Sequence, residues 1–141
     1  TGMSTEAEIE EAVQVADPEV LMHSVSSYPS PTEDLNLRYV RHLDKKYGDR
    51  QVGYSGHELQ LHTAASAVAL GSDWVERHIT LNKNAWGSDQ EASLEPDELS
   101  ELVRVIRETE EALGPENAEE ELYERDVRES EKAKRKSLRG E

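Results

Sequence analysis

The chain has 141 residues; 35% of them are hydrophobic, 33% are charged, and the formal net charge is −15. This length suits one domain with a modest core, and the negative charge argues against nucleic acid or membrane surfaces as partners, because both attract clusters of Lys and Arg. Cysteine is absent, which excludes disulfides, zinc–thiolate sites and cysteine nucleophiles. No apolar run approaches the ~20 residues of a membrane span, so we expect a cytoplasmic protein.

The first half of the sequence predicts a helix, a strand and a second helix. Residues 4–16 have an apolar stripe at helical spacing, and Asp17-Pro18 ends that helix. Residues 19–27 read as a buried strand. Residues 31–48 predict a helix, with acidic residues in the first turn and basic residues in the last.

The second half continues the alternation of strands and helices. A short apolar strand is predicted over residues 50–56, and a helix of small residues over 58–71. A third strand covers 73–81, and the clearest helix covers 95–114, with a proline in its first turn and a glycine at its end. Residues 116–141 have almost no apolar positions, which is typical of a charged helical or flexible tail.

Strands that alternate with helices predict an α/β fold with a parallel sheet and crossover connections. The predicted strands show almost no alternation of apolar and polar residues, so we expect both faces of the sheet to be covered. An α/β barrel and a doubly wound sheet both fit this pattern.

In both architectures the active site gathers at the carboxyl ends of the strands. Polar side chains follow each predicted strand, and we expect them to share one rim: Ser26, Tyr28, Ser55, His57, His78 and Asp89. Two histidines at neighbouring strand ends are suited to bind one divalent metal, which would polarise a carbonyl as a Lewis acid. Serine hydroxyls suit phosphate or carboxylate groups, Asp89 suits sugar hydroxyls, and Trp86 would form an apolar wall.

Each of these residues also has a structural alternative. A strand histidine is often buried and satisfied by a backbone partner. Ser26 has the right position to stabilise the turn before Pro29, and Asp89 to stabilise a loop turn. Glu76 and Arg77 are expected to pair with neighbours inside a barrel, with Glu76 as a candidate partner of the metal ligands.

The motifs SSYPSPTEDLNLR, VGYSGHE, AVALG, ERHITL and GSDQEASLEP occur in this order. They resemble the C-terminal part of the TIM-barrel catalytic domain of the sialic acid synthase (N-acetylneuraminate synthase) family. The resemblance implies a partial TIM barrel over residues 1–115, with three βα units that correspond to about the last three of eight. Residues 116–141 would follow as the tail.

The family resemblance also implies an activity. Its members condense phosphoenolpyruvate with N-acetylmannosamine or a related N-acetylated amino sugar and release phosphate, which makes them transferases of carbohydrate biosynthesis. By motif position, a divalent metal, manganese or alternatively magnesium or cobalt, would be held by His57 and His78. Ser55 would contact phosphoenolpyruvate, Ser26 and Tyr28 would line the substrate pocket, and Asp89 would contact the sugar. His57, His78 and Asp89 are thus the implied catalytic residues.

Three parallel strands would leave open edges, and the family's phosphate-binding lysines belong to strands that this sequence lacks. We therefore expect the isolated chain to be inactive, and to act as a homo-oligomer or with a complement of the missing N-terminal half. A non-catalytic half-barrel or assembly module is a second hypothesis. A third is a synthase of a related nonulosonic acid, of the legionaminic or spore-coat type.

Overall fold

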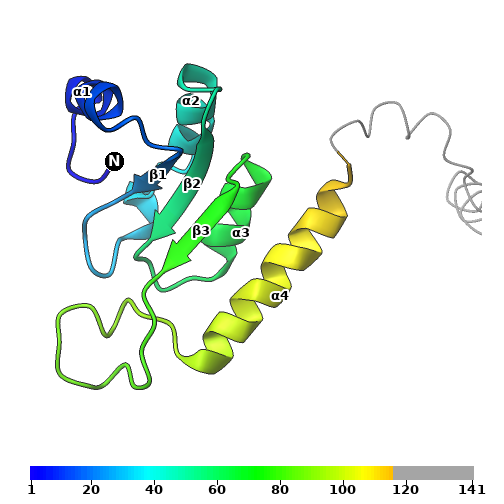
Figure 1. Cartoon of the computed structure of the whole chain (residues 1–141). Coiled ribbons are helices and arrows are strands. Elements are labelled where there is room, and N and C mark those ends of the chain that lie inside the picture. Colours follow the sequence, from blue (N-terminus) through cyan, green and yellow to red (C-terminus); the bar gives the residue numbers. More distant parts are fainter. Residues whose placement is uncertain (116–141) are drawn as a thin grey trace, which may run out of the picture.

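The computed structural model describes residues 1–115, which form a parallel sheet and four α-helices in alternating order (Figure 1). The strands are β1 (Val20–Ser24), β2 (Gln51–Gly56) and β3 (Trp74–Arg77). The helices are α1 (Glu6–Ala16), α2 (Arg38–Lys46), α3 (His62–Ala69) and α4 (Pro96–Leu113). The prediction of an α/β fold with three parallel strands is confirmed. The predicted tail over residues 116–141 lies outside the described residues.

The sheet has the order β1-β2-β3, and both neighbouring pairs are parallel. The carboxyl ends of all three strands therefore lie at one edge, and the loops that leave them gather there (Figure 1). Gly56, the last residue of β2, pairs with Arg77, the last residue of β3. The next residues along the two strands are His57 and His78, so the register brings the two histidines together.

One face of the sheet packs against the helices and forms the core. Alternate residues of the strands point to this face, where Leu21, Val52 and Tyr54 pack against Val40 and Leu43 of α2. Burial of each such side chain contributes ~1.5–3 kcal/mol. The helix α3 is rich in fully buried alanines and lies against α4. Within the part of the chain that the structure describes, no helix is long and apolar enough to cross a membrane.

The opposite face of the sheet is covered less than the sequence predicted. Burial alternates along β3, and Trp74, which points to this opposite face, is 52% exposed. The expectation that both faces are covered is therefore wrong for β3. A groove of about 520 Å³ lies beside β3 and is lined by side chains of β1, β3 and α4. Its apolar lining includes Met22, Trp74, Leu99 and Val103.

Two predicted strands are shorter than their sequence patterns indicated, and the helix predicted over residues 58–71 covers only His62–Ala69. The strand predicted over residues 19–27 ends at Ser24, because the following residues form a turn closed by Ser30, whose Oγ donates to the Ser27 carbonyl at 2.8 Å. The strand predicted over residues 73–81 ends at Arg77, after which the chain enters a long loop.

The helix predicted over residues 31–48 is interrupted. A 3₁₀ turn (Thr32–Asp34) precedes Asn36, which has φ 46°, and the α-helix begins only at Arg38. Asn tolerates this left-handed conformation better than most residues. The Leu35 carbonyl, which a continuous helix would use internally, instead accepts a hydrogen bond from His23 Nε2 at 2.7 Å.

Candidate functional site

His57 and His78 lie side by side at the carboxyl edge of the sheet. Their ring centroids are 5.1 Å apart and the rings meet edge to face at 78°. His57 is 5% exposed, whereas the side chain of His78 is 36% exposed. The pair is therefore anchored on one side and open to solvent on the other.

The hydrogen bonding of His57 fixes its tautomer. His57 Nδ1 lies 2.7 Å from the Val25 carbonyl oxygen, and because a carbonyl only accepts, Nδ1 must carry the proton. The Nε2 lone pair is then available to a ligand. Histidines that bind metals usually have this arrangement, in which the second ring nitrogen donates to a carbonyl or carboxylate. The His57 carbonyl in turn accepts from Ser30 N at 3.0 Å, which ties the turn after β1 to the end of β2.

The loop between β3 and α4 is closed at its base beside His78. Ile79 and Leu94 form a parallel bridge, and Leu94 N donates to the His78 carbonyl at 2.8 Å. Leu94 is fully buried and anchors this base in the core. Asp89 returns from the loop to place Oδ2 3.9 Å from His78 Nδ1, which is too long for a hydrogen bond. The Asp89 carboxylate can therefore still accept hydrogen bonds from a ligand.

The remaining predicted residues lie at different distances from the histidine pair. The Tyr28 ring lies 4.2 Å from the His57 ring and 5.7 Å from the His78 ring, so it forms a wall of the same site. Ser55 lies on β2 just before the site, and its hydroxyl donates to Glu76 Oε1 on β3 at 2.8 Å. Trp86 is 99% exposed and forms no wall.

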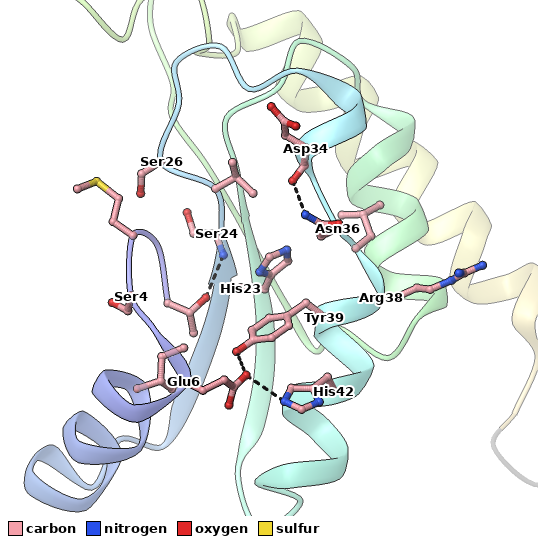
Figure 2. A pocket seen from close by; sticks show the side chains of 15 residues that line it. Ser4, Glu6, His23, Ser24, Ser26, Asp34, Asn36, Arg38, Tyr39 and His42 are labelled. Carbon is pink, nitrogen blue, oxygen red and sulfur yellow. Dashed lines mark hydrogen bonds and ion pairs between the residues drawn. The ribbon is translucent and has the colours of Figure 1, made fainter.

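Ser26 is exposed and faces a different hollow. It lines a cavity of about 840 Å³ between α1 and α2, drawn in Figure 2. Many of the polar groups in this cavity are already paired. Glu6 accepts from the Tyr39 hydroxyl and lies 3.1 Å from His42 Nε2 (Figure 2). Hydrogen bonds from Lys46 and Tyr39 lower the pKa of Glu6 to about 2.

The buried histidine in this region, His23 of β1, has the structural role that strand histidines often have. It is 5% exposed and its Nε2 is hydrogen-bonded to the Leu35 carbonyl. Burial lowers the pKa of His23, so the neutral form is favoured. Because Glu6, Tyr39 and His42 in this cavity already contact one another, and His23 is held by a backbone carbonyl, the histidine pair is the better candidate site.

Directly behind the histidine pair lies a buried ion pair between Arg77, which was expected to pair, and Glu58, which was not predicted as its partner. Arg77 Nη1 lies 3.2 Å from Glu58 Oε1, and the two side chains are 1% and 0% exposed. The Tyr54 hydroxyl donates to Glu58 Oε2 at 2.8 Å, and Thr63 Oγ1 donates to Oε1. Burial and the charge of Glu58 raise the pKa of Tyr54, so this hydroxyl remains a donor.

The position of Arg77 corrects the expectation that it points into a barrel interior. It shares the helix-facing side of β3 with Val75, which packs against the core. A sequence signal for the pair existed, because an arginine in a short apolar strand requires a buried acid nearby. Glu58, next to His57, was the available partner.

Two imidazoles are the metal-binding groups that the site offers. Among residues 1–115, no group of three or more His, Cys, Asp or Glu side chains is arranged to hold a metal ion. The chemistry of the donor set still fits a catalytic divalent ion, because imidazole is a common ligand and the other positions would be left to water and substrate. His57 Nε2 and a ring nitrogen of His78 would be the protein ligands.

Parallel βα units with polar side chains gathered at the strand ends define this chain as part of an α/β protein, and its similarity to solved synthases identifies the fold as the TIM-barrel type. The chain belongs to the NeuB family, whose sequence pattern matches residues 1–118. The resemblance of its motifs to sialic acid synthases is thereby confirmed.

Known proteins support this assignment. The chain is 45% identical over 113 residues to N-acetylneuraminate-9-phosphate synthase of Homo sapiens, covering 79% of this chain and 32% of that protein. It is 40% identical over 121 residues to N,N'-diacetyllegionaminic acid synthase of Campylobacter jejuni, covering 81% and 36%. The crystal structure of N-acetylneuraminic acid (sialic acid) synthetase from Leptospira borgpetersenii in complex with citrate matches with a TM-score of 0.76 and 36% identity, over 87% of this chain and 46% of that one. The chain thus spans about a third of the length of the human and Campylobacter jejuni synthases.

Proposed function

We propose that this chain is the part of a phosphoenolpyruvate-dependent sialic acid synthase that carries the metal-binding histidines. The main observation behind this proposal is that the imidazole rings of His57 and His78, at neighbouring strand ends, have centroids 5.1 Å apart, with His57 Nδ1 hydrogen-bonded to a backbone carbonyl. Family membership and the names of the relatives support the activity. The proposed metal is manganese, with magnesium or cobalt as alternatives.

In the proposed reaction, the enol carbon of phosphoenolpyruvate forms a bond to the aldehyde carbon of an open-chain N-acetylated amino sugar. Water adds at the carbon that bears the phosphate group, and phosphate leaves. A bound divalent ion would supply Lewis-acid polarisation of the aldehyde. No covalent intermediate with the protein is required.

The side chains of this chain would bind and orient the two substrates. Asp89 Oδ2 is free to accept a hydrogen bond from a sugar hydroxyl, since Ser88 donates only to Oδ1, at 2.7 Å. Ser55 donates to Glu76, so its hydroxyl must rotate before it can donate to an oxygen of phosphoenolpyruvate. Tyr28 would pack against the substrates beside the histidines. For Ser26, a substrate contact requires the loop after β1 to turn away from the cavity between α1 and α2.

A second candidate function is an assembly module that is active only with a partner. The observation that favours it is the free edge of β3 beside the apolar groove, with Trp74 half-exposed. An unpaired strand edge invites pairing with another chain. Lys83, in the loop after β3, is a poor candidate to bind the phosphate of phosphoenolpyruvate, because its Nζ is paired with Glu98 Oε1 at 2.5 Å. The groove would therefore bind the complementary half of a barrel or a second copy of the chain.

A synthase of a related acid is the third candidate, favoured by the 40% identity to the legionaminic acid synthase. Comparing N-acetylmannosamine with the diacetylated amino sugar that corresponds to diacetyllegionaminic acid, as alternative substrates, distinguishes the sialic acid synthase from the legionaminic acid synthase.

Mn²⁺ titration of the purified chain, with free Mn²⁺ measured by electron paramagnetic resonance, tests the metal site. We expect one binding site that is lost in His57→Ala and in His78→Ala. His62→Ala is the matched control, because His62 is an exposed residue at the start of α3. Equal binding by all three variants would assign Mn²⁺ to the acidic surface and remove the metal proposal.

Phosphate release tests the activity. The chain alone, given phosphoenolpyruvate, N-acetylmannosamine and Mn²⁺, is expected to release no phosphate. Adding the segment of a family member that precedes the matched region should restore release and should require His57. Release by the chain alone would eliminate the assembly-module hypothesis, and no release from the mixture would count against the synthase.

A further inference from the structure

The buried ion pair behind the histidines joins the two strand ends that carry them. Arg77 immediately precedes His78, and Glu58 immediately follows His57. The Arg77 guanidinium contacts the Glu58 carboxylate at 3.2 Å, donates to the Glu58 carbonyl, and approaches the Gln60 carbonyl at 3.4 Å. One side chain of β3 therefore holds three acceptors in the turn that follows His57.

The fork of a guanidinium fixes direction as well as distance. Its planar N–H groups accept only a narrow set of acceptor positions, unlike the mobile ammonium group of lysine. Tyr54 and Thr63 hold the Glu58 carboxylate from two other sides. The turn after β2 is thus tied to β3, to β2 itself and to the first turn of α3.

Stability alone is a weak reason for such a pair. Removing two charges from water costs nearly as much as their attraction returns, and well-packed apolar residues often stabilise a core equally well. What the charged pair adds is a fixed geometry. The fixed part of the chain is the turn that carries His57.

Gly56 provides independent evidence that the network is built into the backbone. A Cβ on Gly56 would lie 2.7 Å from Glu58 Oε2 and 2.8 Å from Tyr54 Cε1. The carboxylate therefore folds back over the last residue of β2, into space that any side chain would occupy.

We propose that Arg77 and Glu58 are positioning residues that hold His57 with Nδ1–H on the Val25 carbonyl and its Nε2 beside His78. Neither residue would touch substrate. The proposal rests on the metal site described above for its functional meaning. The orientation of His57 can nevertheless be measured without any metal.

The test uses ¹⁵N NMR of the histidine side chains in the full chain. Wild type should show His57 as a single Nδ1–H tautomer. Arg77→Lys keeps the charge and loses the fork, and the double variant Glu58→Gln/Arg77→Met leaves no unpaired buried charge. Both should show mixed tautomers at His57, and the Kd for Mn²⁺ should rise about tenfold, as is usual when a partner of a metal ligand is removed.

Leu43→Ala is the control, because it should lower the free energy of unfolding by a comparable amount. Leu43 is fully buried in α2, which leads into the amino end of β2, whereas His57 follows the carboxyl end. This variant should lose stability and keep the His57 tautomer. Its result separates loss of positioning from general loosening of the fold.

Folded variants that keep the wild-type His57 tautomer would overturn the proposal. So would variants that all unfold, because the ion pair would then serve folding. If wild type binds no Mn²⁺ at the histidines while the tautomer shifts as expected, the metal proposal fails and the positioning role stands.

Discussion

Replacing Gly56 by alanine should destabilise the protein even though the backbone at this position suits any residue. The new methyl group would meet the Glu58 carboxylate at 2.7 and 3.0 Å and the Tyr54 ring at 2.8 Å. These contacts are shorter than carbon can tolerate, so the carboxylate must move. Glu58 has no solvent to move into, because it is fully buried.

The cost follows from the bonds that Glu58 would lose. A hydrogen bond to a charged group contributes ~1.5–3 kcal/mol, and the Tyr54–Glu58 bond is the first to break. Alanine returns ~0.4–1 kcal/mol by restricting the unfolded chain. A net loss of about 1.5 kcal/mol remains, equivalent to a fall in Tm of about 6 °C for a domain of this size.

Urea unfolding followed by far-UV circular dichroism measures this change. Gly48→Ala is the comparison variant: its new Cβ would meet only the Asp44 carbonyl oxygen, at 3.1 Å, and no buried carboxylate, so it should lose less stability than Gly56→Ala. A Gly56→Ala protein as stable as wild type would refute the reasoning. It would show that the Glu58 carboxylate can shift without losing its partners.

Three further predictions concern stability. Hydrogen bonds from its partners lower the pKa of Glu6 to about 2 from 4.5, so its carboxylate stabilises the fold above pH 4.5 and this contribution is lost as the pH falls toward 2. The difference in Tm between wild type and Glu6→Gln should therefore close over that pH range, and a constant difference would contradict the prediction. Burial lowers the pKa of His23 below 6.5, so the free energy of unfolding should fall as pH drops below 6.5, whereas His23→Gln, measured by the same urea titrations, should lack this part of the slope. Leu94→Ala should cost ~2–5 kcal/mol in urea unfolding, because it opens a cavity beneath the loop base; a loss below about 1 kcal/mol would mean that the loop is held elsewhere.

Elements whose boundaries depend on local sequence were predicted well. The predicted helix over residues 95–114 corresponds to α4 (Pro96–Leu113), because a proline at its start and a glycine at its end are local signals. The predicted strand over 50–56 corresponds to β2 (Gln51–Gly56). The break near Asn36 was missed, since it depends on His23 taking the Leu35 carbonyl from across the fold.

The candidate site shows the same division. Strand alternation was enough to predict that His57 and His78 lie together, because parallel strands end at one edge. The tautomer of His57 was beyond prediction, since its partner Val25 is 32 residues away and is placed by a turn. The facing of Ser26 toward another cavity likewise depends on the path of that turn. The catalytic and binding roles of these residues stay predictions.

The bridge between Ile79 and Leu94 fixes the two ends of the intervening loop independently of the loop tip. Its ends are held together by backbone hydrogen bonds that do not depend on the side chains at its tip, where Trp86 lies. Doubling the length of such a loop would cost only ~0.6 kcal/mol in closure entropy. Changes confined to the exposed tip around Trp86 should therefore leave His78 in place, whereas Asp89, further along the same loop, belongs to the proposed site.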